Sequence, residues 1–255
     1  MSDALLKLSG VSHTFPNGTR ALAPTNLTLE TGSFVSLVGP SGCGKSTLLR
    51  IASGLMQPST GQVNRAFAAK PGDVGFVFQD ATLMPWAKVI DNVCLPLEIS
   101  GSNAESALAK AMSALERVGL AEFADAYPRQ LSGGMRMRVS IARAIVTNPR
   151  LLLMDEPFAA LDEFTRFKLN DDLLQLWQAN RWTVMFVTHS VREAVFLSER
   201  IVVMTPRPGR IAADIRVNLP AHRDAALRLG HVFADESARI TLALEQAMAT
   251  GDQAA

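Results

Sequence analysis

The chain has 255 residues, of which 48% are hydrophobic and 6% aromatic, a composition that suits an α/β protein. Its 25 Lys and Arg residues nearly balance 24 Asp and Glu residues, so charge gives no reason to expect nucleic acid or an anionic membrane as a direct partner. Two cysteines are too few for a disulfide framework, and no apolar run approaches the ~20 residues of a membrane-spanning helix.

The N-terminal half predicts strands that lead into a glycine-rich loop. The first thirty residues alternate loosely between apolar and polar and are broken by turn residues, which predicts short antiparallel strands. The apolar run 34–38 predicts a buried strand, and residues 45–52 have helical character. A further strand is expected at residues 74–78.

The second half alternates between the two kinds of element. Leu108, Met112 and Leu115 recur at helical spacing within a mostly helical stretch from about residue 89 to 145. Later apolar runs alternate with helical segments, which predicts a mainly parallel sheet covered on both faces. These runs are 151–154, 183–188 and 200–205, and helices are expected to begin near Asp162 and Ser190. Residues 211–217 alternate as in a strand, and a helical tail with Leu227, Leu242 and Leu244 follows.

The loop at residues 39–46 matches the phosphate-binding pattern G-x-x-x-x-G-K-[ST], between a predicted strand and a predicted helix. Its glycines let successive backbone N–H groups surround a β-phosphate, and the following helix adds its positive end. We expect Lys45 to reach the β- and γ-phosphates and Ser46 to ligate Mg²⁺. The residues expected to bind the nucleotide are Gly39, Pro40, Ser41, Gly42, Cys43, Gly44, Lys45, Ser46 and Thr47.

Two carboxylates end the apolar run that begins at Leu151. Open α/β sheets bind ligands at the carboxyl ends of their strands, and adjacent strand residues point in opposite directions. Asp155 is therefore expected to hold Mg²⁺ through water, and Glu156 to activate the attacking water as general base. An ordinary strand end with solvated acids is the alternative, which the preceding phosphate loop disfavours.

A glycine-rich segment, Leu131–Met135, precedes this strand, with Gln79 upstream and His189 downstream. In this order the motifs resemble an ATP-binding cassette (ABC) ATPase over about residues 5–215. In that family the segment caps the γ-phosphate held by a second subunit, so the resemblance implies a homodimer with two ATP molecules in its interface. Ser132, Gly133 and Gly134 at a helix start suit such an anion site.

The resemblance also implies further roles. Phe15 stands where the family stacks an aromatic ring on adenine, Gln79 would sense Mg²⁺ and the attacking water, and His189 would contact the γ-phosphate as a catalytic residue beside Lys45 and Glu156. The loop 160–162 would contact the second subunit. Met135 replaces the more frequent Gln, so a polar side-chain contact to the nucleotide is not expected there.

The resemblance further implies the domain organisation, a single domain over residues 1–255. Its fold class is α/β, a P-loop NTPase core with a mainly parallel sheet and an N-terminal antiparallel β subdomain. We expect that core at about residues 1–88 and 146–220, an inserted α-helical subdomain with the signature segment at 89–145, and a C-terminal helical tail at 221–255.

The segment 78–86 resembles the nitrate/sulfonate/taurine branch of bacterial importers. There Met84, Pro85 and Trp86 would receive the membrane permease subunits, although a satellite core cluster is the alternative. The chain would then power uptake of a small anion at the cytoplasmic face of the inner membrane, and an external solute-binding protein would act with the permease. Open alternatives are another solute (bicarbonate or a pyrimidine precursor), a non-transport mechanical switch, and a regulatory subunit without turnover.

Overall fold

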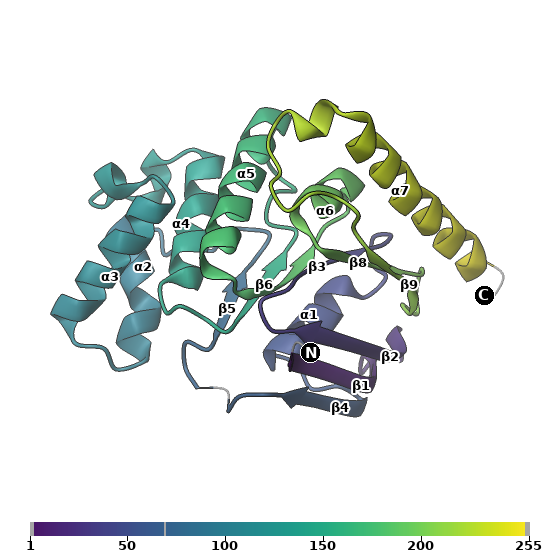
Figure 1. Cartoon of the computed structure of the whole chain (residues 1–255). Coiled ribbons are helices and arrows are strands. Elements are labelled where there is room, and N and C mark those ends of the chain that lie inside the picture. Colours follow the sequence, from purple (N-terminus) through teal and green to yellow (C-terminus); the bar gives the residue numbers. More distant parts are fainter. Residues whose placement is uncertain (1–2, 69, 253–255) are drawn as a thin grey trace. The chain divides into compact units, whose positions relative to one another are not determined.

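The computed structural model describes residues 3–68 and 70–252, and the chain folds as two compact units. Residues 3–68 and 183–252 form the first unit, and residues 70–182 form the second. The second unit therefore interrupts the sequence of the first. It contains the whole stretch, 89–145, for which the sequence predicts helices (Figure 1).

An antiparallel sheet forms the N-terminal part of the first unit. Its central strand β1 (Ala4–Thr14) pairs with β2 (Arg20–Glu30) and with β4 (Thr60–Arg65). The predicted strands β1 and β2 are confirmed, and Leu6 and Leu8 are buried in β1. No strand was expected at β4, because its residues are mostly polar and exposed. Its position depends on pairing with β1 rather than on its own pattern.

The second sheet of the first unit contains the strand that precedes the phosphate loop. Within this unit the strand order is β7–β3–β8–β9, in which β3 is parallel to both neighbours and β9 is antiparallel to β8. Every residue of β3 and β7 is buried, as continuous apolar runs predict. The bounds are Phe34–Val38 (β3), Thr183–Val187 (β7), Arg200–Met204 (β8) and Ile211–Arg216 (β9).

Helices accompany this sheet, and the last of them, α7, packs on α6, β8 and β9. The buried side of α7 includes Phe233, Ile240 and Ala247, whereas Leu242 is 58% exposed. The predicted tail helix therefore exists, but Leu242 does not belong to its buried side. The bounds are Lys45–Ser53 (α1), Val191–Leu197 (α6), His231–Asp252 (α7) and a short 3₁₀ helix at Leu227–Leu229.

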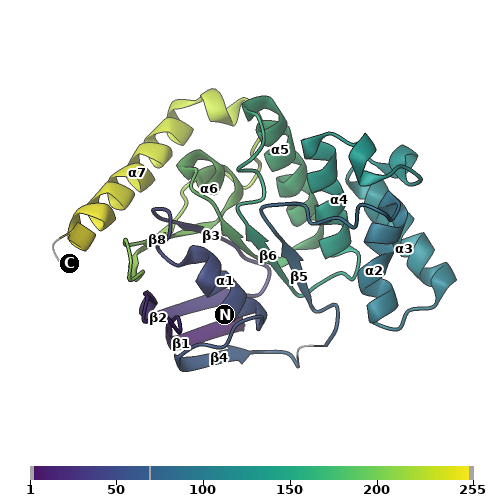
Figure 2. The same cartoon turned by 180° about the vertical axis from the view of Figure 1, so that it is seen from behind.

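The second unit combines two parallel strands with four helices. Strands β5 and β6 pair in register, with Val77 opposite Met154 (Figure 2). Helix α4 contacts α2, α3 and α5. The bounds are Val74–Val77 (β5), Val89–Ile99 (α2), Ala104–Arg117 (α3), Gly133–Ile145 (α4), Leu151–Asp155 (β6) and Glu163–Asn180 (α5), with 3₁₀ helices at Ala121–Phe123 and Pro128–Gln130.

Helix α3 confirms the expected helix, and its buried face is lined mainly by alanines. Ala107, Ala111 and Ala114 are buried with Leu115, whereas Leu108 is 51% exposed. The small alanine side chains let α3 approach α2 and α4 closely, so burial follows the alanines rather than the larger leucine. Within the described residues, no helix has the length and apolar character needed to cross a membrane.

A buried carboxylate ties α7 to the rest of the first unit. Glu236 accepts hydrogen bonds from the backbone N–H of Asn218, at 2.8 Å, and from the Arg239 guanidinium, at 2.9 Å. Burial raises the pKa of Glu236, but these hydrogen bonds and the Arg239 charge outweigh burial. The pKa of the carboxyl therefore lies below its ordinary value in the folded protein.

We expect Glu236→Gln to lower the free energy of unfolding by about 1–2 kcal/mol at pH 7. Because the folded-state pKa is the lower one, this stabilisation is present above the unfolded-state pKa and is lost as the pH falls through the folded-state pKa. Urea denaturation of wild type and variant should therefore differ at pH 7, and the difference should shrink as the pH falls below the ordinary pKa of a glutamate carboxyl and through the lower folded-state pKa. Glu245→Gln, on an exposed part of α7, is the control. A difference that persists unchanged in acid would contradict the assignment.

Candidate functional site

The loop between β3 and α1 carries the candidate phosphate-binding residues of the first unit. Lys45 is the first residue of α1 and is only 4% exposed. Its Nζ donates hydrogen bonds to the carbonyl oxygens of Gly39, at 2.8 Å, and Pro40, at 3.0 Å. The ammonium group therefore lies inside the curled loop. A buried cation favours an anion beside it, which is what the loop pattern predicts for a phosphate.

The backbone at position 44 requires glycine. Gly44 has φ +100°, and a Cβ there would lie 2.8 Å from the Ala21 carbonyl oxygen and 2.7 Å from a Leu22 methyl carbon. Strand β2 therefore supports the loop directly. This arrangement starts α1 immediately after the loop, so that the positive end of the helix adjoins the predicted phosphate position.

His189 is placed at the same edge of the sheet as the phosphate loop. Strands β3 and β7 are parallel neighbours with Leu37 opposite Val187, and the loop and His189 follow their carboxyl ends. The preceding Thr188 is buried and donates to the Glu193 carboxylate at 2.6 Å, whereas His189 is exposed. The first unit thus brings His189 to the expected edge.

Phe15, the predicted adenine-stacking residue, follows β1 in the turn that leads to β2. It is half-buried, and its ring lies edge-on to the His13 ring with centroids 4.8 Å apart. Backbone hydrogen bonds from Phe15 to Thr19 and from Gly18 to Phe15, both at 2.9 Å, close this turn. The turn therefore has a fixed backbone, and part of the Phe15 side chain remains accessible.

The second unit carries the acidic residues. Gln79 and the pair Asp155 and Glu156 follow or end the parallel strands β5 and β6, so they lie at one edge of this strand pair. Asp155 is 8% exposed. Glu156 has φ +46°, a left-handed conformation that is uncommon for a residue other than glycine. Backbone strain of this kind is concentrated at functional sites.

The predicted signature segment forms the N-terminus of α4. The Ser132 hydroxyl accepts a hydrogen bond from the Met135 N–H at 3.2 Å and caps the helix. Gly134 is buried against α5, because a Thr165 methyl carbon lies 2.6 Å from where a Cβ would be. Hydrogen bonds from Thr165 hold the pKa of Asp162 below its ordinary value. The signature segment and the start of α5 are therefore packed together.

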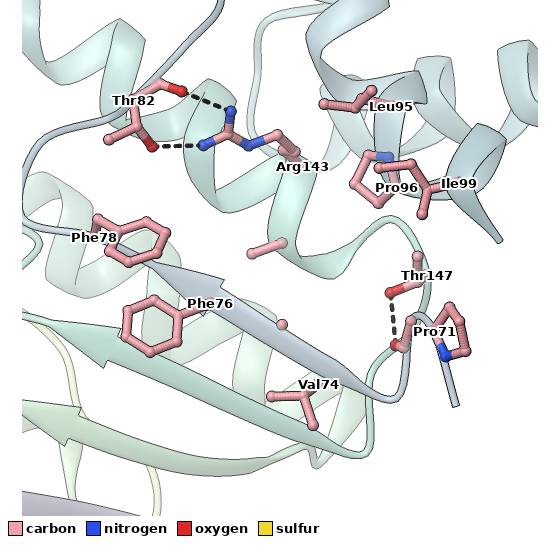
Figure 3. A pocket seen from close by; sticks show the side chains of 13 residues that line it. Pro71, Val74, Phe76, Phe78, Thr82, Leu95, Pro96, Ile99, Arg143 and Thr147 are labelled. Atoms are coloured by element: carbon pink, nitrogen blue, oxygen red, sulfur yellow. Dashed lines mark hydrogen bonds between the residues drawn. The ribbon is translucent and has the colours of Figure 1, made fainter. Parts of the chain in front are cut away.

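Arg143 of α4 holds the segment that follows Gln79. Its guanidinium donates to the Thr82 carbonyl oxygen at 2.9 Å and to the Thr82 hydroxyl at 3.0 Å (Figure 3). It also donates to the Ala81 carbonyl oxygen at 2.9 Å. Burial lowers the pKa of this guanidinium from its ordinary value. The sequence alone does not indicate this role of Arg143, because nothing in the helical pattern points to a contact with a segment about sixty residues earlier.

Asn92 fixes the continuation of the same segment. It is fully buried in α2, accepts a hydrogen bond from the Met84 N–H at 2.7 Å, and donates to the carbonyl oxygens of Met84 and Lys88 at 3.2 and 2.9 Å. Between these anchors Pro85 and Trp86 are exposed, Trp86 to 77%. An ordered backbone therefore presents an apolar side chain to solvent.

A mostly apolar groove of about 400 Å³ also lies in the second unit (Figure 3). Strand β5 lines it with Val74 and Phe76, and helix α2 lines it with Leu95, Pro96 and Ile99. The rings of Phe76 and Phe78 stack with centroids 4.3 Å apart. Phe78 and Thr82 belong both to this groove and to the segment 78–86. Exposed apolar grooves of this kind are typical of surfaces that receive a partner.

The residues expected to ligate Mg²⁺ offer suitable atoms. Ser46, Gln79 and Asp155 supply hydroxyl, amide and carboxylate oxygens, which are the donor types that Mg²⁺ prefers. In the part of the chain that the structure describes, no cluster of three or more His, Cys, Asp and Glu side chains could hold a metal by itself. This donor set fits a Mg²⁺ ion that binds together with nucleotide phosphates, which supply the remaining oxygens.

Comparisons with known proteins identify related chains. The pattern of the family described as "ABC transporter" matches residues 22–159. An aliphatic sulfonates import ATP-binding protein of Pseudomonas syringae is 50% identical over 81% of this chain and 85% of its own length. A nitrate import ATP-binding protein of Synechocystis is 43% identical over 80% of this chain and 78% of its own. Among solved structures, a dimeric ATP-binding cassette in a post-hydrolysis state with ADP and Pi superposes on this chain with a TM-score of 0.73. The two sequences are 34% identical, and the match covers 84% of this chain and 100% of that chain.

We expect Arg143→Met to loosen the segment after Gln79, because it removes every hydrogen bond from the guanidinium to Ala81 and Thr82. Loss of hydrogen bonds from a charged donor costs about 1.5–3 kcal/mol, so amide hydrogen exchange at residues 81–84 should accelerate about tenfold or more. Arg150→Met, which removes an exposed pair with Asp73 at 3.8 Å, is the control and should leave that exchange unchanged. Equal exchange in wild type and Arg143→Met would show that Arg143 does not hold the segment.

Proposed function

Because the chain belongs to the ABC transporter family, we propose that it is the ATP-hydrolysing subunit of an importer for a small anion such as an aliphatic sulfonate, taurine or nitrate. The predicted fold class, an α/β P-loop NTPase core, is confirmed by the likeness to solved cassettes. The chain is an ATPase, as predicted. The proposed type of cargo rests on the sequence identity to two related proteins. One is named a nitrate import ATP-binding protein (43% identical) and the other an aliphatic sulfonates import ATP-binding protein (50% identical).

In the proposed mechanism the first unit holds the nucleotide. The N–H groups of residues 39–47 and the buried Lys45 ammonium bind the β- and γ-phosphates, and Phe15 stacks on adenine. Ser46, with Gln79 and Asp155 of the second unit, would hold Mg²⁺, which neutralises phosphate charge. The enclosed position of Lys45 supports its role, because the charge is already oriented before a phosphate arrives.

The second unit supplies the water chemistry in this proposal. Glu156 accepts a proton from a water molecule whose oxygen attacks the γ-phosphorus, the bond to the β–γ bridging oxygen breaks, and ADP leaves. Gln79 orients that water, and His189 of the first unit contacts the γ-phosphate. The left-handed backbone of Glu156 supports a special role at this position, because such a conformation persists only where the surroundings enforce it.

The proposed active form is a homodimer. Ser132, Gly133 and Gly134 start α4 and would cap the γ-phosphate of ATP bound to the other copy, as helix N-termini favour anions. Two copies related by a two-fold axis then enclose two ATP molecules. The dimeric state of the related cassette solved with ADP and Pi supports this arrangement.

The proposed membrane partner docks on the second unit. Met84, Pro85 and Trp86 together with the apolar groove beside Phe78 and Thr82 would receive a cytoplasmic segment of the permease subunits. The chain would thereby be held at the cytoplasmic face of the inner membrane, and an external solute-binding protein would deliver the anion to the permease.

The proposed cargo class is tested by transport. The purified complex in lipid vesicles should accumulate labelled sulfonate, taurine or nitrate only when ATP is present. Uptake of bicarbonate or a pyrimidine precursor instead would overturn the cargo class.

We expect Glu156→Gln to lower the rate of ATP hydrolysis about 10²–10⁴-fold, because an amide cannot accept the proton from water. ATP binding should persist, so the variant should elute as an ATP-dependent dimer in size exclusion. Glu163→Gln, in the exposed first turn of α5, is the matched control and should hydrolyse ATP at the wild-type rate. Normal turnover by Glu156→Gln would refute the role of general base.

We expect Trp86→Asp to abolish assembly with the permease while the isolated chain still binds ATP, since Trp86 is exposed and a buried carboxylate would oppose docking. Co-purification with the tagged permease measures assembly. Leu55→Asp alters a residue of the first unit that is 66% exposed and should assemble normally. Normal assembly of Trp86→Asp would remove this surface from the interface.

A further inference from the structure

The turn between β8 and β9 lies directly against the phosphate loop. A Cβ on Gly209 would be 1.9 Å from the Cys43 carbonyl oxygen, so no other residue fits at this position without a shift of the backbone. At the other end of the loop, a Cβ on Gly39 would be 3.0 Å from the Met204 carbonyl oxygen. The end of β8 and the turn therefore support the loop from Gly39 to Cys43.

This turn is itself held in place by hydrogen bonds. The Gly209 N–H donates to the Ala21 carbonyl, and the Gly209 carbonyl accepts from the Ala23 N–H, both at 3.0 Å. Within the turn, Thr205 N–H donates to the Arg210 carbonyl at 2.9 Å, and the Arg210 N–H donates to the Thr205 hydroxyl at 3.1 Å. The turn is thus fixed to β2, the strand that also supports Gly44.

Arg207 extends from this fixed turn to the phosphate loop. Its Nε donates a hydrogen bond to the Gly42 carbonyl oxygen at 3.1 Å, and its Nη2 lies 3.0 Å from where a Gly42 Cβ would be. The side chain is exposed, so it lies at the outer side of the loop. Its positive charge is therefore close to the loop without being part of the phosphate-binding pattern.

The contact fixes the orientation of one peptide group. In a planar trans peptide the carbonyl oxygen and the following N–H point in opposite directions. Since the Gly42 carbonyl is directed out to Arg207, the Cys43 N–H is directed into the loop, where it donates to the Pro40 carbonyl at 3.3 Å. The Pro40 carbonyl also accepts from the Lys45 ammonium, so the Cys43 N–H and that ammonium converge on one oxygen inside the loop.

We propose that Arg207 is a positioning residue for nucleotide binding: by holding the Gly42 carbonyl outward, it keeps the Cys43 N–H on the inner side of the loop, where the β-phosphate binds. The role depends on ATP binding by the isolated chain and not on the nature of the transported anion. It is separate from the roles of Lys45 and Ser46, because Arg207 acts on the loop from outside.

The test compares three purified variants. Arg207→Met keeps the aliphatic stem and removes both the donor and the charge, and we expect the KM for ATP to rise about three- to tenfold. The kcat should change less than about twofold, because binding to substrate and transition state is weakened alike. Arg207→Lys keeps a donor and a charge and should have a KM between those of wild type and Arg207→Met. Arg210→Met, in the same turn, should have the wild-type KM.

Dissociation constants for ADP and AMP distinguish positioning from a general loss of structure. ADP should bind Arg207→Met more weakly by about the same factor as ATP, whereas AMP, which has no β-phosphate, should bind as it does to wild type. An unchanged KM for ATP in Arg207→Met would overturn the proposal. So would equal losses for ADP and AMP, an equal loss in Arg210→Met, or an Arg207→Lys variant as weak as Arg207→Met.

Discussion

The buried ammonium of Lys45 imposes the strictest constraint on the first unit. A charge that is only 4% exposed must be surrounded by oxygen atoms, and the carbonyls of Gly39 and Pro40 can reach it only because the loop curls back over the start of α1. That curl brings Gly44 against β2 and the Cys43 carbonyl against Gly209. Three segments that are distant in the sequence are therefore shaped around one positive charge, and the same geometry prepares the loop for a phosphate.

In the second unit, the segment after Gln79 has an ordered backbone but exposes apolar side chains. Arg143 and Asn92 satisfy the carbonyls and N–H groups of the segment after Gln79, so that segment is held without burying its own side chains. Trp86 can then stay exposed at a defined place, beside a chain segment that also lines the groove. If this segment is the docking surface proposed above, its rigid presentation lowers the entropy cost of binding the permease.

The sequence predicted those parts of the molecule whose pattern is local. The buried strands expected at 34–38 and 151–154 have continuous apolar runs and were identified correctly. Strand β4 was missed because its polar residues depend on pairing with β1. The spacing of Leu108, Met112 and Leu115 indicated the helix α3 but not that alanines line its buried face. Arg143 and Arg207 were missed for a related reason: each contacts a segment about 60 or 165 residues away, which no spacing rule can reveal.

The interleaved order of the two units has a consequence for synthesis. Strand β3 and its phosphate loop are made early, but β3 pairs with β7 and β8, which follow about 150 residues later. A ribosome that has released residue 182 has completed the second unit but only the N-terminal part of the first. The nucleotide loop of such a nascent chain lacks both its neighbouring strands and the turn at Gly209, so the capacity to bind ATP arises only after β7, β8 and this turn have been made.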